Sequence, residues 1–154
     1  MNKSKYLVHA ASIAAVYAVL TIAFAPLSYG QVQVRFAEAL TILPFFTPAA
    51  IPGLFVGCIA ANFFSPGGIL DVVFGSAATL IAAYLSYKMP SRWLVPLPPV
   101  IVNGIIIGYL LHYLYQLPLL ITIGWVALGE LISCYFIGYP LILILERYRD
   151  KIFK

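Results

Sequence analysis

Glu130 is the residue whose position most strongly suggests chemistry, because it is a carboxyl inside a long apolar stretch. It lies twelve residues past Pro118, which at about 1.5 Å per helical residue places it near the middle of a lipid bilayer. Insertion scales put the cost of a charged group at that depth at roughly 2.5–3.5 kcal/mol, so the side chain must face the interior of a helix bundle. We interpret Glu130 as a ligand or proton site. The alternative is a structural partner of a backbone N–H or of His112.

Other polar residues gather toward the outer end of the expected bundle. Arg35 and Glu38 are three residues apart and therefore share one face of a helix; the alternative is an interfacial salt bridge. Asp71 opens a helix, where capping is the alternative role. Asn103 is expected to join helices rather than to contact ligand. For the aromatic residues near this end, the alternative is ordinary packing in the core or at the membrane–water interface. The predicted substrate-binding set is Arg35, Glu38, Asn62, Asp71, Tyr109, His112, Trp125 and Glu130.

The chain lacks the motifs of several enzyme classes. It contains no Gly-x-x-x-x-Gly-Lys-Ser/Thr, so it is not expected to hydrolyse nucleotide itself. There is no His-Glu-x-x-His among its two histidines and no Gly-x-Ser-x-Gly. The cysteines, Cys58 and Cys134, lie in apolar segments without metal-ligand spacing and are expected to be small buried residues. We therefore predict no enzyme activity, no metal site and no cofactor bound by this chain.

The elements that must position these residues are membrane helices. The 154 residues are 63% hydrophobic and 9% charged, with a mean hydropathy of +1.00, whereas soluble domains carry roughly 25% charged residues. A bilayer core needs about 20 helical residues per crossing. We predict a single all-α membrane domain, residues 1–154, a polytopic bundle of six transmembrane helices. The expected spans are Leu7–Leu27, Ala37–Phe46, Ala49–Phe64, Leu70–Tyr87, Pro98–Tyr115 and a long helix, Leu117–Leu145, bent near Pro140.

The basic residues predict the orientation of the bundle. Eight of the nine Lys and Arg residues fall in three clusters, which six spans place on one side; basic loops are normally cytoplasmic. We therefore expect a multi-pass cell-membrane protein with both termini in the cytoplasm. These clusters flank apolar runs and form no stripe for nucleic acid. The clusters are Lys3 and Lys5; Lys88 and Arg92; and Arg147, Arg149, Lys151 and Lys154.

Two features leave the topology open at particular points. The second and third segments are short and broken by Pro44, Pro48 and Pro52, so a re-entrant hairpin would give the same loop positions. Irregular backbone at this depth must be covered by protein or line a cavity. The first segment imitates a secretory signal peptide, but Pro26 follows the candidate cleavage site and the next segments are equally apolar. We interpret it as an uncleaved membrane helix.

Small residues on the first helix predict a packing surface. Ala10, Ala11, Ala14 and Ala15 give overlapping small-x-x-x-small spacings that allow another helix to approach closely. The surface serves either packing within the bundle or docking of a partner subunit near the cytoplasm.

Two stretches resemble a known family. The segment from Gln33 to Asn62, QVRFAEALTILPFFTPAAIPGLFVGCIAAN, and the segment from Ser65 to Ser76, SPGGILDVVFGS, are similar to the QueT family of substrate-binding S components of energy-coupling factor (ECF) transporters. The resemblance extends over the whole chain, although the remainder is generic apolar sequence. It implies a six-helix S component that captures substrate from outside. It also implies docking, through the small-residue motif on helix one, onto a transmembrane coupling protein with two ATPases, which use the ATP.

The family is associated with uptake of queuosine precursors, which are 7-deazaguanine bases. A flat base of this kind presents adjacent N–H donors, which a buried carboxylate such as Glu38 or Glu130 can accept, while Trp125 or a tyrosine stacks on the ring. Arg35 and its loop would close over the base. Two other functions remain open on the sequence: an S component for a vitamin or another micronutrient, and a structural membrane subunit without transport activity.

Overall fold

The computed structural model describes residues 2–30 and 32–153, and all regular structure in these residues is helical. Lys154, which belongs to the third basic cluster, lies outside the described residues. The elements in chain order are α1 (Lys3–Ala23), α2 (Ala25–Ser28), η1 (Phe36–Phe45), α3 (Ala50–Asn62), α4 (Gly68–Leu70), η2 (Asp71–Gly75), α5 (Ser76–Lys88), α6 (Leu97–Tyr115), α7 (Leu119–Leu131), η3 (Ile132–Gly138) and α8 (Tyr139–Ile152).

Four helical stretches in the described residues are long and apolar enough to cross a membrane: Lys3–Ala23, Gly68–Lys88, Leu97–Tyr115 and Leu119–Arg149. The second joins α4, η2 and α5, and the fourth runs from α7 through η3 into α8. Two further apolar helices, η1 and α3, have only 10 and 13 residues. The all-helical membrane fold is therefore confirmed, whereas the count of six crossings is not.

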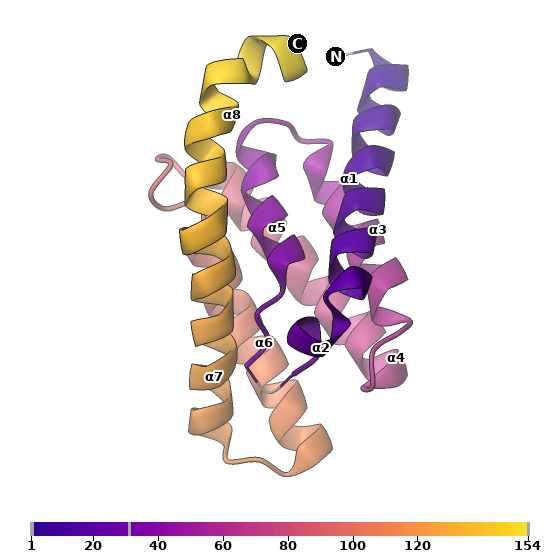
Figure 1. Ribbon diagram of the computed structural model, residues 1–154, viewed down its shortest axis with the longest axis vertical. Coiled ribbons are helices and arrows are strands. Elements are labelled where there is room, and N and C mark those ends of the chain that lie inside the picture. The colour runs from indigo at the N-terminus through magenta and orange to yellow at the C-terminus, as the bar shows by residue number, and fades with distance from the viewer. Residues whose placement is uncertain (1, 31, 154) are drawn as a thin grey trace.

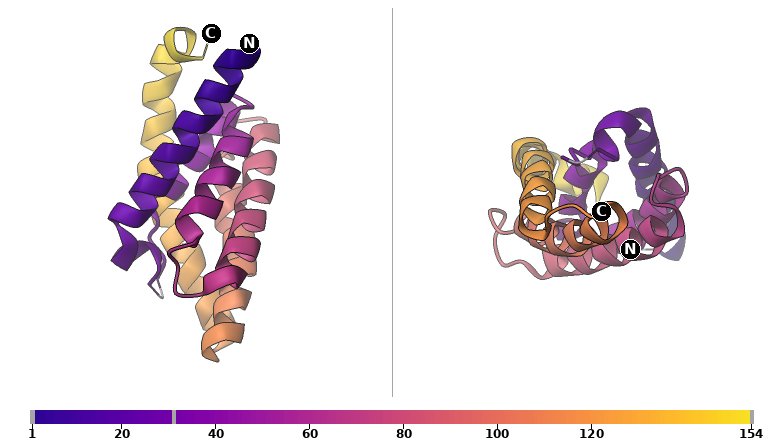
Figure 2. Two further views of the ribbon diagram at one scale, coloured as in Figure 1. Left: turned by 90° about the vertical axis from the view of Figure 1, so that its right-hand side faces the viewer. Right: turned by 90° about the horizontal axis from the view of Figure 1, so that it is seen from below.

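The helices form an elongated bundle whose two termini lie at the same end (Figure 1; Figure 2, left). The turn between α6 and α7 forms the opposite end. There α6 stops because Gln116 adopts a left-handed conformation, with φ of 53°, and Pro118 follows directly.

The short helix η1 is the most enclosed element of the bundle. Seven of its ten residues are buried, and it packs against α1, α3, α5 and η3. Its 3₁₀ geometry, the tighter and shorter type of helix, and the presence of Pro44 explain why it is brief. The expectation that irregular backbone here is covered by protein is confirmed.

Close packing of α1 on α3 depends on two glycines. A Cβ at Gly53 would lie 2.7 Å from the Ala10 carbonyl oxygen, and one at Gly57 would lie 2.8 Å from the Ala14 oxygen. The four-residue spacing of these glycines lets the two backbones approach, as small residues do in membrane helices. This approach brings Tyr17 of α1 into the centre of the bundle, where its side chain is fully buried.

Two π-helical stretches, η2 and η3, interrupt the long helices. The sequence predicts an irregularity near Pro140, and η3 ends two residues before it. Proline removes a backbone donor, so the preceding turn loses a hydrogen bond and can widen. Both π-helices adjoin buried polar residues.

Candidate polar binding site

The centre of the candidate site is the carboxyl group of Glu38, which is 1% exposed on η1. The Tyr17 hydroxyl from α1 donates a hydrogen bond to its Oε1. Nη1 of Arg35 lies 3.9 Å from the same oxygen, which confirms that the three-residue spacing brings the two side chains together. The second oxygen, Oε2, is buried without a hydrogen-bond partner. One oxygen of this carboxyl is thus hydrogen-bonded within the protein, and the other is buried without a hydrogen bond.

The thiol of Cys58 on α3 joins a second set of polar groups. Its Sγ accepts hydrogen bonds from Asn62 Nδ2 and Thr79 Oγ1, each at 3.3 Å, and Arg35 Nη1 lies 4.0 Å away. Asn62 also donates to the backbone oxygen of Asp71 at 2.9 Å. Arg35 Nε and Asn62 Oδ1 are buried without partners. These open groups offer a ligand both a donor and an acceptor.

Glu130, 4% exposed on α7, lies in the same interior. The Cys134 thiol donates to its Oε2 at 3.6 Å, and the same sulfur lies 3.5 Å from the Glu38 backbone oxygen. The side chain of Asn103 from α6 interacts with the carboxyls of both Glu38 and Glu130. The sequence-based expectation that Glu130 faces the bundle interior is confirmed.

These side chains form one buried group, which we call the polar cluster. Besides Arg35, which precedes η1, its members come from six helices: α1, η1, α3, α5, α6 and the continuous α7–η3 helix. Buried polar atoms are normally hydrogen-bonded, so several open atoms in one place indicate a site for a polar ligand. Its members are Tyr17, Arg35, Glu38, Thr41, Cys58, Asn62, Thr79, Asn103, Glu130 and Cys134.

The segment before η1 covers this cluster. A Cβ at Gly129 would lie 2.5 Å from the Gln33 carbonyl oxygen, so the segment packs directly on α7 beside Glu130. Tyr29 donates from its hydroxyl to the Ala61 carbonyl oxygen at 2.6 Å, and the Arg35 guanidinium lies 5.6 Å from its ring centre. Burial raises the pKa of the Tyr29 hydroxyl, which therefore stays a proton donor.

Asp71 lies at the edge of the cluster and is partly buried. Its carboxylate accepts a hydrogen bond from Ser65 Oγ, and its backbone oxygen accepts one from Asn62. No side chain caps α4, so Asp71 is not the helix cap that its position suggests. Its contacts fix the turn that carries Asn62.

Three of the expected site residues lie away from the polar cluster. Tyr109 and Trp125 are 60% and 47% exposed, and the ring of His112 hydrogen-bonds the Leu117 backbone oxygen near the α6–α7 turn. The partners of Glu130 in the described part of the chain are Cys134 and Asn103, so His112 does not fill the role considered for it.

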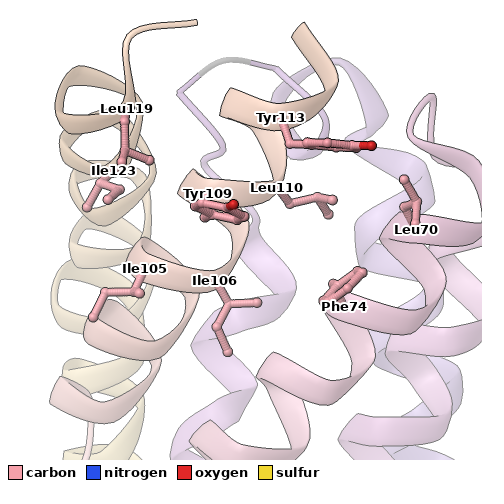
Figure 3. Close-up of a pocket in the computed structure, with 9 residues that line it drawn as sticks. All are labelled: Leu70, Phe74, Ile105, Ile106, Tyr109, Leu110, Tyr113, Leu119 and Ile123. Atoms are coloured by element: carbon pink, nitrogen blue, oxygen red, sulfur yellow. The ribbon is translucent and has the colours of Figure 1, made fainter. Parts of the chain in front are cut away.

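A large cavity lies apart from the polar cluster. It has a volume of about 830 Å³ and is lined by apolar and aromatic side chains of α4, η2, α6 and α7, including Tyr109 (Figure 3). A second cavity of about 350 Å³ lies on α7 beside Trp125. Neither is lined by a member of the polar cluster. In a membrane protein, exposed apolar hollows of this kind face acyl chains.

The small residues of α1 divide between two faces. Ala10 and Ala14 face the glycines of α3, whereas Ala11 and Ala15 are exposed. Ala11 and Ala15 lie among exposed apolar side chains that include Leu7 and Val8. Packing within the bundle therefore uses Ala10 and Ala14, whereas Ala11 and Ala15 remain exposed.

Comparisons with known proteins identify the family of this chain. A family model described as QueT transporter matches residues 7–147. The chain belongs to the QueT transporter family. It is 31% identical over 156 residues to the queuosine precursor transporter QueT of Lactococcus lactis subsp. cremoris (strain MG1363), covering 90% of this chain and 91% of that protein. No solved structure matches this chain significantly. The QueT family is a family of transporters and not of enzymes.

Sequence reasoning missed some members of the cluster. Tyr17 lies in a helix without a clear apolar face, and only its contact with Glu38 reveals a role. Cys58 and Cys134 are buried in the core as expected, and their thiols also hydrogen-bond polar side chains, which the sequence does not reveal. The spacing Cys58-x-x-x-Asn62 was a usable signal, because residues four apart share a helical face. Within the described residues no group of three or more His, Cys, Asp or Glu side chains is arranged to hold a metal ion.

Proposed function

We propose that this protein is the substrate-binding membrane subunit of an ECF-type importer and that it captures a queuosine precursor, a 7-deazaguanine base, from outside the cell. The observation that carries the proposal is the polar cluster, with its open atoms on Glu38, Arg35 and Asn62, inside a member of the QueT transporter family. The name of the L. lactis relative supports the choice of substrate.

The open atoms match the hydrogen-bonding groups of such a base. A deazaguanine presents adjacent N–H donors along one edge, and Glu38 Oε2 is a buried acceptor without a partner. Arg35 Nε can donate to the ring carbonyl, and Asn62 Oδ1 can accept from another N–H. A site of this kind rejects an analogue that lacks a matching group by roughly 10⁴–10⁵, because its own polar atoms would be left unpaired.

Entry of the substrate requires movement of the segment that covers the cluster. Gln33 packs against Gly129 and Tyr29 is tied to the Ala61 carbonyl. In the proposed cycle this segment opens to the exterior, admits the base and closes again through Arg35. The aromatic groups near the base are then Tyr17 and Tyr29 rather than Trp125.

The rest of the proposal concerns topology and partners. All six apolar segments cross the membrane, η1 and α3 being short because neighbouring helices shield their ends. Both termini are cytoplasmic, in keeping with the basic residues at that end of the bundle. The exposed side of α1 docks onto a transmembrane coupling protein, and two partner ATPases use ATP to reorient the loaded bundle.

Binding by the isolated protein tests the substrate. Titration calorimetry on purified protein in detergent should give nanomolar to micromolar affinity for a 7-deazaguanine base. Tight binding of a vitamin with no heat from any deazaguanine would retain the transporter and overturn the substrate. If no small molecule binds, the structural-subunit alternative gains support.

Substitutions on the exposed face of α1 test docking. Replacing Ala15 with leucine should abolish uptake in cells that contain the ATPase module while affinity for the base stays unchanged. Ala60→Leu on α3 is a matched control, because Ala60 is also exposed on a membrane helix, and it should leave uptake intact. Equal loss in both variants, or lost affinity in A15L, would contradict the docking role.

A further inference from the structure

The last turns of α8 leave the bundle, and one side chain returns to it. Ile142 is fully buried and Leu145 is partly buried, whereas residues 146–149, 151 and 152 are exposed. Phe153, directly after α8, is again partly buried and packs against the main hydrophobic core. Beyond Leu145, in the residues whose side chains the structure describes, the ring of Phe153 is therefore what holds the end of α8 to the core.

This ring joins two other elements of the bundle. It stacks on Phe46, with the ring centres 5.4 Å apart and an angle of 14° between the planes. It also lies 6.4 Å from the ring centre of His9 on α1, with the planes at 90°. Both are favourable aromatic arrangements. We call Phe153, Phe46 and His9 the terminal aromatic cluster, because they lie toward the end of the bundle that carries both termini (Figure 1).

The terminal aromatic cluster covers the inner end of the helix that carries the candidate site. Glu38 is the third residue of η1, and Phe46 directly follows the last one. Between the two clusters η1 packs against α1, η3 and α8. The side chains of Phe46 and Thr47, at the turn after η1, are buried. Because protein interiors are close-packed, a solute that leaves Glu38 along η1 must displace these side chains.

His9 makes the closed arrangement easier to open. Its Nδ1 is buried without a hydrogen-bond partner, and such an atom costs free energy that contact with water would recover. Movement of Phe153 away from the imidazole would provide that contact. In the sequence of α1, His9 lies between Val8 and Ala11, which are exposed on the helix proposed for docking. A partner that binds there contacts the turn of α1 that belongs to the terminal aromatic cluster.

We propose that Phe153 is an inner gate: its stacking on Phe46 keeps the polar cluster closed toward the side of the termini, and its release opens that side. The inference deepens the proposed function and rests on it for the direction of transport, because that side is then the cytoplasm. Phe153 acts through Phe46 on the end of η1 and is therefore a positioning residue. The segment before η1 closes the opposite end, so that the two closures lie at the two ends of η1.

The native cysteines report opening of the polar cluster. Cys58 and Cys134 are fully buried members of it with free thiols, and the sequence contains no other cysteine. A charged maleimide that does not cross membranes is applied to right-side-out and to inverted vesicles that contain the full chain. F153A should raise the labelling rate from the side of the termini roughly tenfold, because an aromatic pair and the burial of the ring are lost. The rate from the opposite side should stay unchanged.

Three further variants separate the gate from a general structural role. Y148A is the matched control, because Tyr148 is an aromatic residue of α8 that is 49% exposed, and it should leave both rates unchanged. F153W keeps an aromatic face against Phe46 and should label at the wild-type rate. If F153A does not accumulate in membranes, F153L, which has no flat ring, should show the same one-sided increase.

Several outcomes would overturn the inner gate. They are an unchanged rate in F153A, an equal rise from both sides, and a rise in Y148A or F153W as large as that in F153A. The labelling needs neither substrate nor the ATPase module, so the inference can fail while the proposed function stands. Conversely, a one-sided increase in a protein that binds no 7-deazaguanine base in calorimetry would support the gate and overturn the proposed substrate.

Discussion

The polar cluster and the large cavity beside α6 differ in almost every property. The cavity offers about 830 Å³ of space, with a lining of apolar and aromatic side chains, whereas the cluster lines neither this cavity nor the one beside Trp125 and contains buried donors and acceptors without partners. In a membrane protein, lipid fills apolar hollows, so empty volume is a poor guide to a polar substrate. Under the proposed function, buried polar atoms without partners mark the site, and empty volume does not.

The largest effect is expected from removing the charge of Glu38. E38Q leaves the Arg35 guanidinium buried without its ion-pair partner, and breaking such a pair costs roughly 3–5 kcal/mol of stability. It also removes the carboxylate that accepts the N–H edge of the base. Thermal unfolding in detergent measures the first effect and calorimetry the second.

The control for E38Q is E146Q, because it also removes one carboxylate charge from an ion pair. The side chains of that pair, Arg92 and Glu146, are 46% and 35% exposed. Exposed pairs contribute little to stability, so its unfolding temperature should hardly change. A similar loss of stability in both variants would mean that burial of the Glu38 ion pair does not increase its contribution.

The next effect concerns the packing that brings Tyr17 into the cluster. A Cβ at Gly57 would lie 2.8 Å from the Ala14 oxygen and 2.9 Å from Tyr17 Cβ. G57A should therefore destabilise the protein by about 1–3 kcal/mol, as overpacking does, and weaken ligand binding by displacing the tyrosine. Chemical or thermal unfolding gives the stability change.

Gly124 on α7 provides the control glycine for G57A. An added Cβ there meets nothing within 4 Å, so G124A should be neutral or stabilising by up to about 1 kcal/mol. If G124A is as harmful as G57A, close approach of α1 and α3 is not the cause.

An effect of similar size is expected from Y17F. The substitution removes the hydroxyl that donates to Glu38 Oε1 and keeps the ring, so loss of this hydrogen bond to a carboxyl should cost roughly 1.5–3 kcal/mol. Ligand affinity should fall because the Glu38 side chain is no longer held in one orientation. Unchanged affinity in a stably folded Y17F would remove Tyr17 from the site.

The sequence predicted those features of the fold and of the polar cluster that depend on composition and local spacing. The apolar character gave an all-helical membrane protein, and the depth of Glu130 required it to face inward, which the structure confirms. The three-residue spacing of Arg35 and Glu38 placed them together. Each of these rests on helical geometry or on the cost of a charge in lipid, which a single segment reveals.

The sequence could not predict contacts that depend on how the helices are rotated against one another. Tyr109 and Trp125 are aromatic residues at the expected height, yet they face outward. Tyr17 lies in a helix whose apolar residues are spread around all sides, so the sequence does not show which face points inward; the packing of α1 on Gly53 and Gly57 does. Rotation about a helix axis follows from packing rather than from hydropathy.

The smallest effect is expected at Tyr109, and it separates the two regions most directly. Tyr109 lines the large cavity and is 60% exposed, with no contact to the polar cluster among the interactions of the described residues. Y109L should therefore change the affinity for a 7-deazaguanine base by no more than about twofold, the effect typical of surface substitutions. Calorimetry under the conditions used for E38Q makes the two values comparable. A tenfold loss in Y109L, with binding retained in E38Q, would move the site from the polar cluster to the cavity, because stacking on an outer tyrosine would then supply affinity that the buried carboxyl does not.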